Sequence, residues 1–182
     1  MHVLGAWLFR NRGWTPVPLL VLQGLSSERV LPWAGLIVIV LGELIRMWAV
    51  GHIGSQSRTR GGEVGELVQS GPFGRCRNPL YVGNGVLLIG VGLWGGPAWA
   101  AAWFVFAALQ YTAVVRWEES ILLGSHGVAY QSYCERTPRW IPLGKPQEAG
   151  AWSLSRALRS ERATLLAIVV VMTVFWGPIC YA

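Results

Sequence analysis

Charged residues are scarce in this sequence of 182 residues, at 13%, whereas an ordinary soluble domain carries roughly a quarter. Hydrophobic residues make up 53% of the chain. The length is that of about one domain, too short for two independent soluble cores and a linker. This deficit of charge indicates that much of the chain faces lipid.

Paired cysteines are also missing. Cys76, Cys134 and Cys180 lie far apart, without the spacing of a zinc site or a disulfide framework. His52 and His126 have no metal-ligand partner at useful spacing, so we interpret both as structural or interfacial residues. The sequence therefore predicts no metal site.

No long basic stripe is present, although the formal net charge is +6. The basic residues lie in short loops between apolar runs, which is the pattern that orients a protein in a membrane. The 11 tryptophans suit the two interfaces of a bilayer, where amphipathic rings collect. We therefore expect the lipid bilayer, and no nucleic acid, as a partner.

Several apolar runs are candidates for membrane-spanning helices. Three are near-continuous and close to the ~20 residues that a span needs: Leu31–Val50, Pro97–Val115 and Thr164–Ala182. Leu80–Trp94 is shorter and ends at a Gly-Gly-Pro turn, which favours a helical hairpin with the next run. Trp14–Leu25 is the weakest candidate, because it is short and has two prolines near its start.

The distribution of arginines suggests a topology. If the chain crosses the membrane five times with its N-terminus in the cytoplasm, Arg29 is the one arginine in a loop on the outer side, and the other arginine-containing loops lie on the cytoplasmic side. We therefore expect an all-α, polytopic transmembrane bundle of about five spans, closed by a cytoplasmic helix and loops. Its parts are 1–50 (membrane helices), 51–145 (catalytic region) and 146–182 (linker and last span). Glu43 and Arg46, three residues apart, are expected to neutralise one another.

Asn78 and Pro79 mark the expected start of the third span. Asn is a strong N-cap, and Pro is favoured at the first position of a helix. The free amide groups of this helix end, beside Arg77, would suit a carboxylate or phosphate. The alternative is a capped membrane helix with ordinary cytoplasmic arginines.

Glu118 and Glu119 stand at the expected C-terminal end of the fourth span, where carboxylates oppose the helix dipole. Adjacent helical residues point about 100° apart, so one glutamate could face a pocket while the other pairs with an arginine. The alternative is a simple salt bridge to Arg116 or Arg139.

Aromatic and basic residues then recur every three positions, at Tyr130, Tyr133, Arg136 and Arg139. On a helix they form one stripe until Pro138 interrupts it, and a membrane-interface belt explains the stripe equally well. Upstream, Gly83-Asn84-Gly85 lies inside an apolar helix, where small residues favour helix packing.

Together these motifs resemble the isoprenylcysteine carboxyl methyltransferase and phospholipid methyltransferase superfamily of membrane enzymes. The segment 77–83, the glutamate pair 118–119 and the segment 127–142 are similar to three motifs of that family, in the same order. The resemblance covers roughly residues 70–143. Asn78 stands where the prenylcysteine enzymes typically have histidine.

This resemblance implies a methyltransferase with S-adenosylmethionine as cofactor, in an integral membrane protein (of the inner membrane, if bacterial) whose active site faces the cytoplasm. The implied cofactor-binding residues are Arg77, Asn78, Pro79, Tyr81, Gly83, Glu118, Tyr130 and Tyr133. The implied catalytic residues are Glu118, Glu119 and Arg139, the last of which would orient the acceptor. The acceptor is expected to be hydrophobic or membrane-resident, with a carboxylate, an amine or a thiol as its reacting group.

Two other functions fit the same architecture. Sterol reductases share part of it, so a membrane reductase that uses NADPH is one alternative. A membrane subunit without enzymatic activity is the other.

Overall fold

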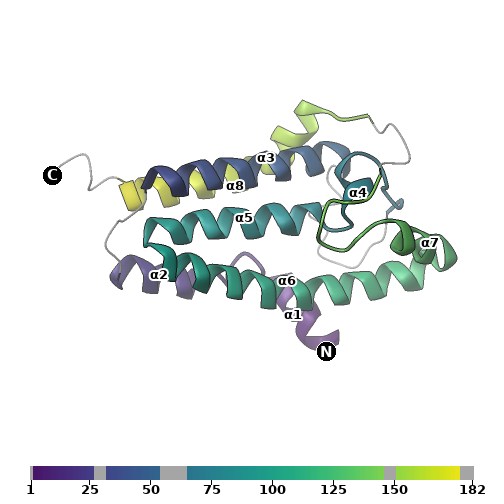
Figure 1. The fold of residues 1–182 in the computed structure, drawn as a ribbon, viewed down its shortest axis with the longest axis horizontal. Coiled ribbons are helices and arrows are strands. Elements are labelled where there is room, and N and C mark those ends of the chain that lie inside the picture. The colour runs from purple at the N-terminus through teal and green to yellow at the C-terminus, as the bar shows by residue number, and fades with distance from the viewer. Residues whose placement is uncertain (1, 27–31, 54–64, 146–150, 177–182) are drawn as a thin grey trace.

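The computed structural model describes residues 2–26, 32–53, 65–145 and 151–176, and within these ranges it has eight helices and no strand (Figure 1). The helices are α1 (His2–Asn11), α2 (Val17–Ser26), α3 (Pro32–Ile53), α4 (Pro72–Arg75), α5 (Pro79–Trp94), α6 (Pro97–His126), α7 (Val128–Arg136) and α8 (Leu154–Trp176). The predicted all-α class is therefore confirmed for the described residues.

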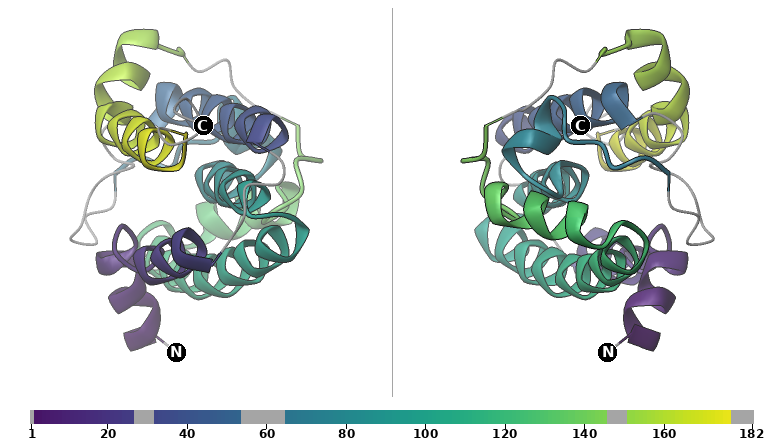
Figure 2. Two further views of the ribbon diagram at one scale, coloured as in Figure 1. Left: turned by 90° about the vertical axis from the view of Figure 1, so that its left-hand side faces the viewer. Right: turned by 90° about the vertical axis from the view of Figure 1, so that its right-hand side faces the viewer.

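Helix α5 lies at the centre of the bundle, with α3 and α8 on one side of it and α6 on the other (Figure 2). The helices α3 and α5 touch backbone to backbone because glycines face one another. A Cβ atom on Gly42 would lie 2.6 Å from the backbone nitrogen of Leu87, and one on Gly90 would lie 2.7 Å from that of Ile39. A Cβ atom on Gly83 would lie 2.9 Å from the Gly42 carbonyl oxygen. The prediction that Gly83 serves helix packing is confirmed.

The predicted hairpin between α5 and α6 is also confirmed. Gly95 and Gly96 donate backbone hydrogen bonds to Gly92 and Leu93, at 2.9 and 3.1 Å, and so end α5. Gly96 has φ 99°, a conformation that residues with a Cβ atom rarely adopt, and Pro97 then begins α6. Beside this turn, Trp94 and Trp103 pack in the buried core.

Two helices of the described part are long and apolar enough to cross a membrane, Trp33–Ile53 within α3 and Pro97–His126. Helix α5 is apolar but shorter. Helix α2 has 10 residues and spans only about 15 Å, half the thickness of a hydrocarbon core of about 30 Å. The run 14–25 therefore packs along the bundle as a short helix: Gln23 donates to the Val91 carbonyl at 2.8 Å and accepts from Trp103 Nε1 at 2.6 Å.

Two expectations about helix ends, those for α6 and α8, are wrong. Helix α6 does not end at Val115 but continues to His126, so Glu118 and Glu119 lie more than a turn from its C-terminus and do not oppose its last carbonyls. Helix α7, which Gly127 with φ 51° separates from α6, ends at Arg136, before Pro138, as predicted. Helix α8 begins at Leu154, ten residues before the apolar run, and so takes up the charged residues in front of that run. The end of the run, 177–182, lies outside the described residues.

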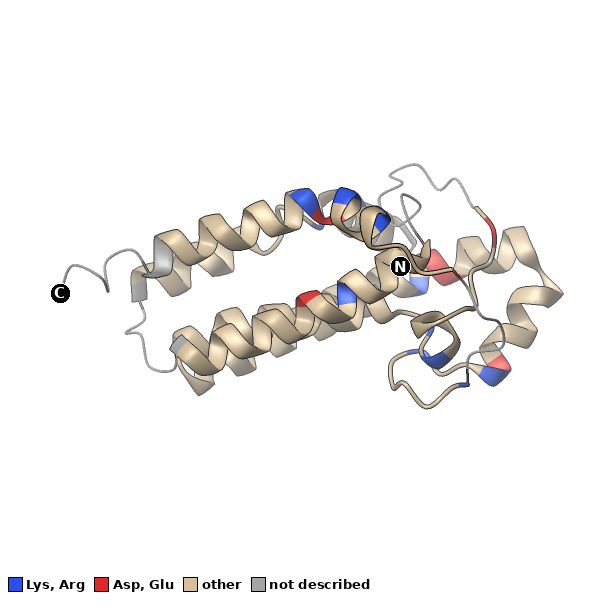
Figure 3. Cartoon of the chain, turned by 90° about the horizontal axis from the view of Figure 1, so that it is seen from above, with Lys and Arg blue, Asp and Glu red and all other residues tan. Residues whose placement is uncertain are grey.

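The charged residues lie toward one end of the bundle, around α1, α7 and the start of α8, with Glu43 and Arg46 at mid-length of α3, and the opposite end is free of them among the residues described (Figure 3). This agrees with the predicted separation of charged and apolar segments. Within the bundle, the expected pair of Glu43 and Arg46 is confirmed, with 3.2 Å between Oε2 and Nε.

Candidate active site

A cavity of about 510 Å³ lies at the charged end of the bundle. Seven helices, α1 and α3 to α8, contribute side chains to its wall, together with the segment 65–68. Five residues expected in the site line this cavity: Arg77, Asn78, Tyr81, Glu118 and Tyr133. The other five do not line it: Pro79, Gly83, Glu119, Tyr130 and Arg139.

Helix α5 begins at Pro79 with Asn78 as its N-terminal neighbour, as predicted. The Asn78 side chain does not cap the helix, however. Its Nδ2 atom donates to the carbonyl oxygen of Arg139 at 3.2 Å and lies 3.5 Å from Glu119 Oε1. Asn78 therefore connects the start of α5 to the segment after α7 and to the C-terminal third of α6.

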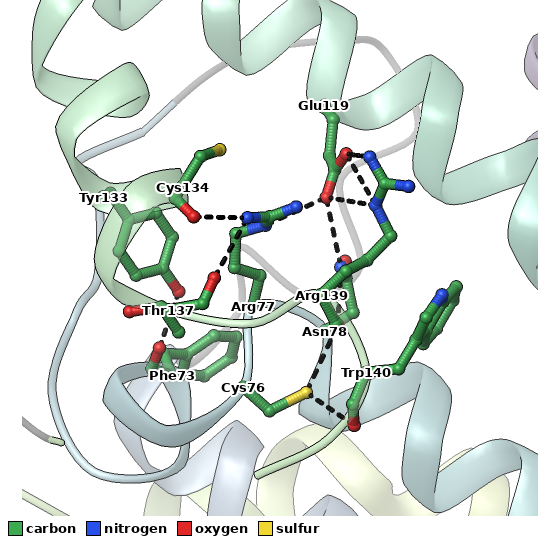
Figure 4. Close-up of polar contacts among 10 residues, drawn as sticks. All are labelled: Phe73, Cys76, Arg77, Asn78, Glu119, Tyr133, Cys134, Thr137, Arg139 and Trp140. Atoms are coloured by element: carbon green, nitrogen blue, oxygen red, sulfur yellow. Dashed lines mark hydrogen bonds and ion pairs between the residues drawn. The ribbon is translucent and has the colours of Figure 1, made fainter. Parts of the chain in front are cut away.

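Glu119 is the hub of this connection (Figure 4). Its carboxylate accepts from Arg77 Nε at 3.1 Å and from Arg139 Nη2 at 2.6 Å. Arg139 Nε adds bonds of 3.1 and 3.0 Å to the two carboxylate oxygens, and this contact raises the pKa of the Arg139 guanidinium. Since Arg77 and Glu119 are largely buried, the pair is screened little by water.

Arg77 also binds the end of α7. Its Nη1 atom donates to the carbonyl oxygens of Cys134 and Thr137, each at 2.9 Å (Figure 4). These carbonyls lack partners inside the helix, so a guanidinium is a favourable ligand for them. One arginine before α5 thus holds the last turn of α7 and the carboxylate of Glu119.

The chain after α7 is tied to the chain before α5. The Tyr133 hydroxyl donates to the Phe73 carbonyl at 2.6 Å, and the backbone nitrogen of Arg77 donates to Pro138 at 2.9 Å. The Cys76 thiol lies 3.3 Å from the Arg139 and Trp140 carbonyls. Burial raises the pKa of the Tyr133 hydroxyl and of the Cys76 thiol, so both groups stay protonated.

Glu118 points in a different direction from Glu119. It lines the cavity and hydrogen-bonds the hydroxyl of Tyr81, whose ring centroid lies 5.2 Å from that of Tyr111. The expectation that one glutamate faces a pocket while its neighbour pairs with an arginine is confirmed. The reason is the ~100° turn between successive residues of α6.

The sequence did not indicate the part of the wall that comes from α1 and the turn after it: Phe9, Arg10, Arg12, Gly13 and Trp14. Phe9 packs on Trp117 of α6 with ring centroids 4.9 Å apart, and Arg12 lies over the Phe9 ring at 4.1 Å. The two arginines had been interpreted only as topology signals. The recurring aromatic residues at 7, 9 and 14 were the signal that could have placed this segment on the bundle.

The wall holds a second polar group, which we call the inner pole: Arg46, Asn84, Glu161 and Thr164. The Arg46 guanidinium donates to Asn84 Oδ1, to Glu161 Oε2 at 2.5 Å and to Thr164 Oγ1 at 3.1 Å. It thereby joins α3, α5 and α8. Neither Glu161 nor Thr164 was singled out from the sequence, because both lie in what had been expected to be a linker or the start of a span.

Within the described ranges, no group of three or more His, Cys, Asp or Glu side chains could hold a metal ion. The polar residues of the cavity are instead paired acids and bases beside aromatic rings. Such a wall suits a small organic molecule that carries both charges.

Two metal-resistance proteins are similar to this chain. The nickel-cobalt-cadmium resistance protein NccN of Alcaligenes xylosoxydans xylosoxydans is 34% identical over 109 residues, which are 59% of this chain and 48% of that protein. The cobalt-zinc-cadmium resistance protein CzcN of Cupriavidus metallidurans is 32% identical over 141 residues, 77% of this chain and 58% of that protein. The matched part thus spans about half the length of each relative. No solved structure matches the chain.

The family model of the phospholipid methyltransferases matches residues 30–127, more than half of the chain. The matched range contains α3, α4, α5 and α6, and with them Arg77, Asn78, Tyr81 and both glutamates. The apolar helices α3 and α6 agree with a membrane protein. The chain therefore belongs to the phospholipid methyltransferase family, within the isoprenylcysteine carboxyl methyltransferase-like superfamily.

Proposed function

We propose that this protein is a membrane methyltransferase that moves a methyl group from S-adenosylmethionine to a hydrophobic acceptor. One observation carries the proposal: Asn78 and Tyr81 of α5 and Glu118 of α6, all within the matched family range, face one cavity. These residues come from two of the three motifs on which the family resemblance rests.

The cavity suits the cofactor in size and in chemistry. Its volume of about 510 Å³ lies within the roughly 300–1,000 Å³ of small-molecule sites. Arg10 and Arg12 offer partners for a carboxylate, and Glu66 and Glu118 offer partners for an ammonium group. Trp14 supplies an aromatic surface for a flat ring.

When bound, S-adenosylmethionine supplies a methyl group on a positively charged sulfur, which a nucleophile can take directly. The protein then has to align the acceptor and exclude water. Leu80, Leu87 and Leu88 of α5 line the cavity and give an acceptor an apolar surface. The side chains of Ile121 and Leu122 extend that surface on α6.

Glu118 is a carboxylate in the cavity, beside Tyr81, that can receive a proton. An amine acceptor must lose a proton before or during methylation, and Glu118, held by Tyr81, could receive it. A carboxylate or thiolate acceptor needs no such base, and Glu118 would then only bind the cofactor.

Glu119 and Arg139 act as positioning residues in this proposal, since neither lines the cavity. Their ion pair, with Arg77, holds α5, α6 and the chain after α7 together. Loss of it would misalign Asn78 and Glu118 without removing a group that touches substrate. Three further residues support the wall in the same indirect way. Pro79 begins α5, Gly83 lies at the contact of α5 with α3, and Tyr130 packs beside Tyr133 in α7.

We further propose that the charged end of the bundle faces the cytoplasm, in the inner membrane if the protein is bacterial. The arginine-rich ends of the apolar helices favour that side. In this arrangement the apolar end of the bundle in Figure 3 lies in lipid.

The test uses the full chain purified in detergent. Calorimetric titration with S-adenosylmethionine should show one site, and membranes incubated with the methyl-labelled cofactor should gain label in the lipid-soluble fraction. NADPH should not compete. Absence of binding, together with unaltered behaviour of Glu118→Gln, would overturn the proposal, and preferred binding of NADPH would favour a reductase.

A further inference from the structure

Helix α8 carries three arginines in its first three turns, Arg156, Arg159 and Arg162. No charged residue follows Arg162 in this helix (Figure 3). At about 100° per residue, the three arginines lie within an arc of about 120° on one face of the helix. All three are exposed, and none lines the cavity. They therefore form a basic surface that is separate from the candidate active site.

The opposite face of α8 fixes this orientation. Ala157 is fully buried, and Glu161 is 1% exposed and binds Arg46 of α3 at 2.5 Å. Glu161 is the one acidic residue of α8, so the exposed face of the helix holds three bases and no acid. Arg156 Nη1 also donates to the carbonyl oxygen of His52, near the end of α3, at 3.1 Å. Helix α8 therefore cannot turn its arginines away from the surface without breaking these contacts.

Arg159 and Arg162 are available to a ligand. Within the described ranges, neither guanidinium has a hydrogen bond or an ion pair with another residue. Each guanidinium has five N–H donors in a fork that matches the oxygens of a phosphate group. Residues three apart are neighbours on a helix surface, so the two cations repel one another. An anion between them would relieve that repulsion.

An apolar stripe continues the same face toward the apolar end of the bundle (Figure 1). Leu166, Val169 and Val170 follow Arg162 by four, seven and eight residues, and they are 66%, 59% and 60% exposed. Four residues of helix rise about 6 Å, so the change from arginine to hydrocarbon takes about one turn. Exposed aliphatic side chains are unfavourable in water but suit lipid chains. The face thus has a cationic part and an apolar part in direct succession.

A ligand that matches both parts must carry an anion next to a hydrocarbon chain. A nucleic acid or an acidic peptide would bind the arginines but leave the apolar stripe bare. A second copy, related by a two-fold axis along the membrane normal, would bring the same arginines together and repel. A phospholipid with a net negative charge matches the arginines with its head group and the stripe with its chains.

We propose that this face of α8 binds an anionic phospholipid, with Arg159 and Arg162 on the phosphate of its head group. An acyl chain lies along Leu166, Val169 and Val170. The site is outside the cavity, so it is independent of the proposed methyl transfer, and the lipid bound there is not the methyl acceptor. Because the lipid binds the folded helix, it also stabilises the bundle.

The test equilibrates the full chain in detergent with equal amounts of phosphatidylglycerol and phosphatidylcholine of the same acyl chains. The protein is then repurified, and the retained lipids are extracted and quantified. Neither lipid has a free amine or a carboxylate, so retention does not report acceptor binding. One arginine near an anionic surface strengthens binding about fivefold, so the wild type should retain phosphatidylglycerol at least about tenfold over phosphatidylcholine.

Two double variants locate the preference on α8. Arg159→Gln with Arg162→Gln should lower the retention ratio below about threefold, because both cations are lost. Arg159→Lys with Arg162→Lys should keep most of it, because the charges remain. Arg75→Gln with Arg136→Gln is the matched control, since it removes two exposed arginines outside the cavity from α4 and α7, and it should keep the ratio.

Equal retention of the two lipids by the wild type would overturn the proposal, and this comparison needs no variant to fold. An equal loss in the matched control would also overturn it, because the whole basic end would then attract the lipid. Glycerol 3-phosphate has the anion without the chains and should not displace the retained lipid. Displacement would identify a site for a soluble phosphate instead. A wild-type dimer that the glutamine variant on α8 dissociates would show that a second copy covers this face.

Discussion

Glu118 and Glu119 are neighbours on α6 but have different surroundings: Glu118 faces the cavity beside Tyr81, and Glu119 accepts hydrogen bonds from Arg77 and Arg139. The two carboxylates are therefore not interchangeable. Their variants should fail in different ways, which gives the first two predictions.

Glu118→Gln should abolish most methyl transfer while the protein keeps its fold. If the carboxylate receives a proton from the acceptor, the rate should fall by about 100-fold or more. Labelled methyl transfer measures the rate, and thermal unfolding in detergent checks the fold. Glu135→Gln, an exposed change on α7, is the control and should leave the rate unaltered. Full activity of Glu118→Gln would contradict the role.

Glu119→Gln should destabilise the protein. It leaves the largely buried Arg77 without a counter-charge, and breaking such a pair costs about 3 kcal/mol. The melting temperature in detergent measures the effect. Arg139→Gln should cost less, because that side chain is 39% exposed and its pair is screened by water. Equal losses for the two variants would contradict the prediction, because they would mean that the buried pair with Arg77 adds nothing.

Gly42→Ala should loosen the contact between α3 and α5. The new Cβ atom would lie 2.6 Å from a backbone nitrogen of Leu87, which cannot move aside, and overpacking of this kind costs about 1–3 kcal/mol. Gly85→Ala is the matched control on α5, because the nearest atom would lie 3.9 Å away. It should leave stability unchanged or raise it by about 0.5–1 kcal/mol. Unfolding in detergent distinguishes them.

Cys76 should react slowly with N-ethylmaleimide in a variant whose other two cysteines are alanine. The thiolate is the reactive form, and burial raises the pKa of this thiol, so the thiolate fraction between pH 7 and 9 stays below that of a free cysteine. The rate should rise to the ordinary value on unfolding. A rate in the folded protein equal to that of a small thiol at the same pH would contradict the buried position.

Local features of the fold could be predicted from the sequence where short-range chemistry decides them. The start of α5 at Asn78 and Pro79 follows from their backbone preferences, and the Gly95-Gly96-Pro97 turn follows from the need for positive φ at Gly96. The end of α6 could not be predicted in this way. Charged residues end an apolar run but not a helix, so α6 continues through the glutamates to His126.

Of the site, the sequence indicated the motif residues but not the whole wall. Asn78, Tyr81 and Glu118 belong to recognisable motifs, whereas Arg12 and Glu161 belong to none. Contacts between segments more than 100 residues apart, such as that of Arg46 with Glu161, leave no local pattern. The prediction that the Asn78 side chain caps α5 was also wrong, because its amide group faces Glu119 and the Arg139 carbonyl instead.

The amino-acid sequence by itself determined the helical class, the apolar helices, the grouping of charge and the family motifs, because each depends on composition or on residues close along the chain. Only the tertiary structure decided which glutamate faces the cavity, that α1 and α8 complete its wall, and that Arg46 forms an inner pole. The physical reason is that a buried charge must find its partners in space, and those partners come from helices that the sequence does not place side by side.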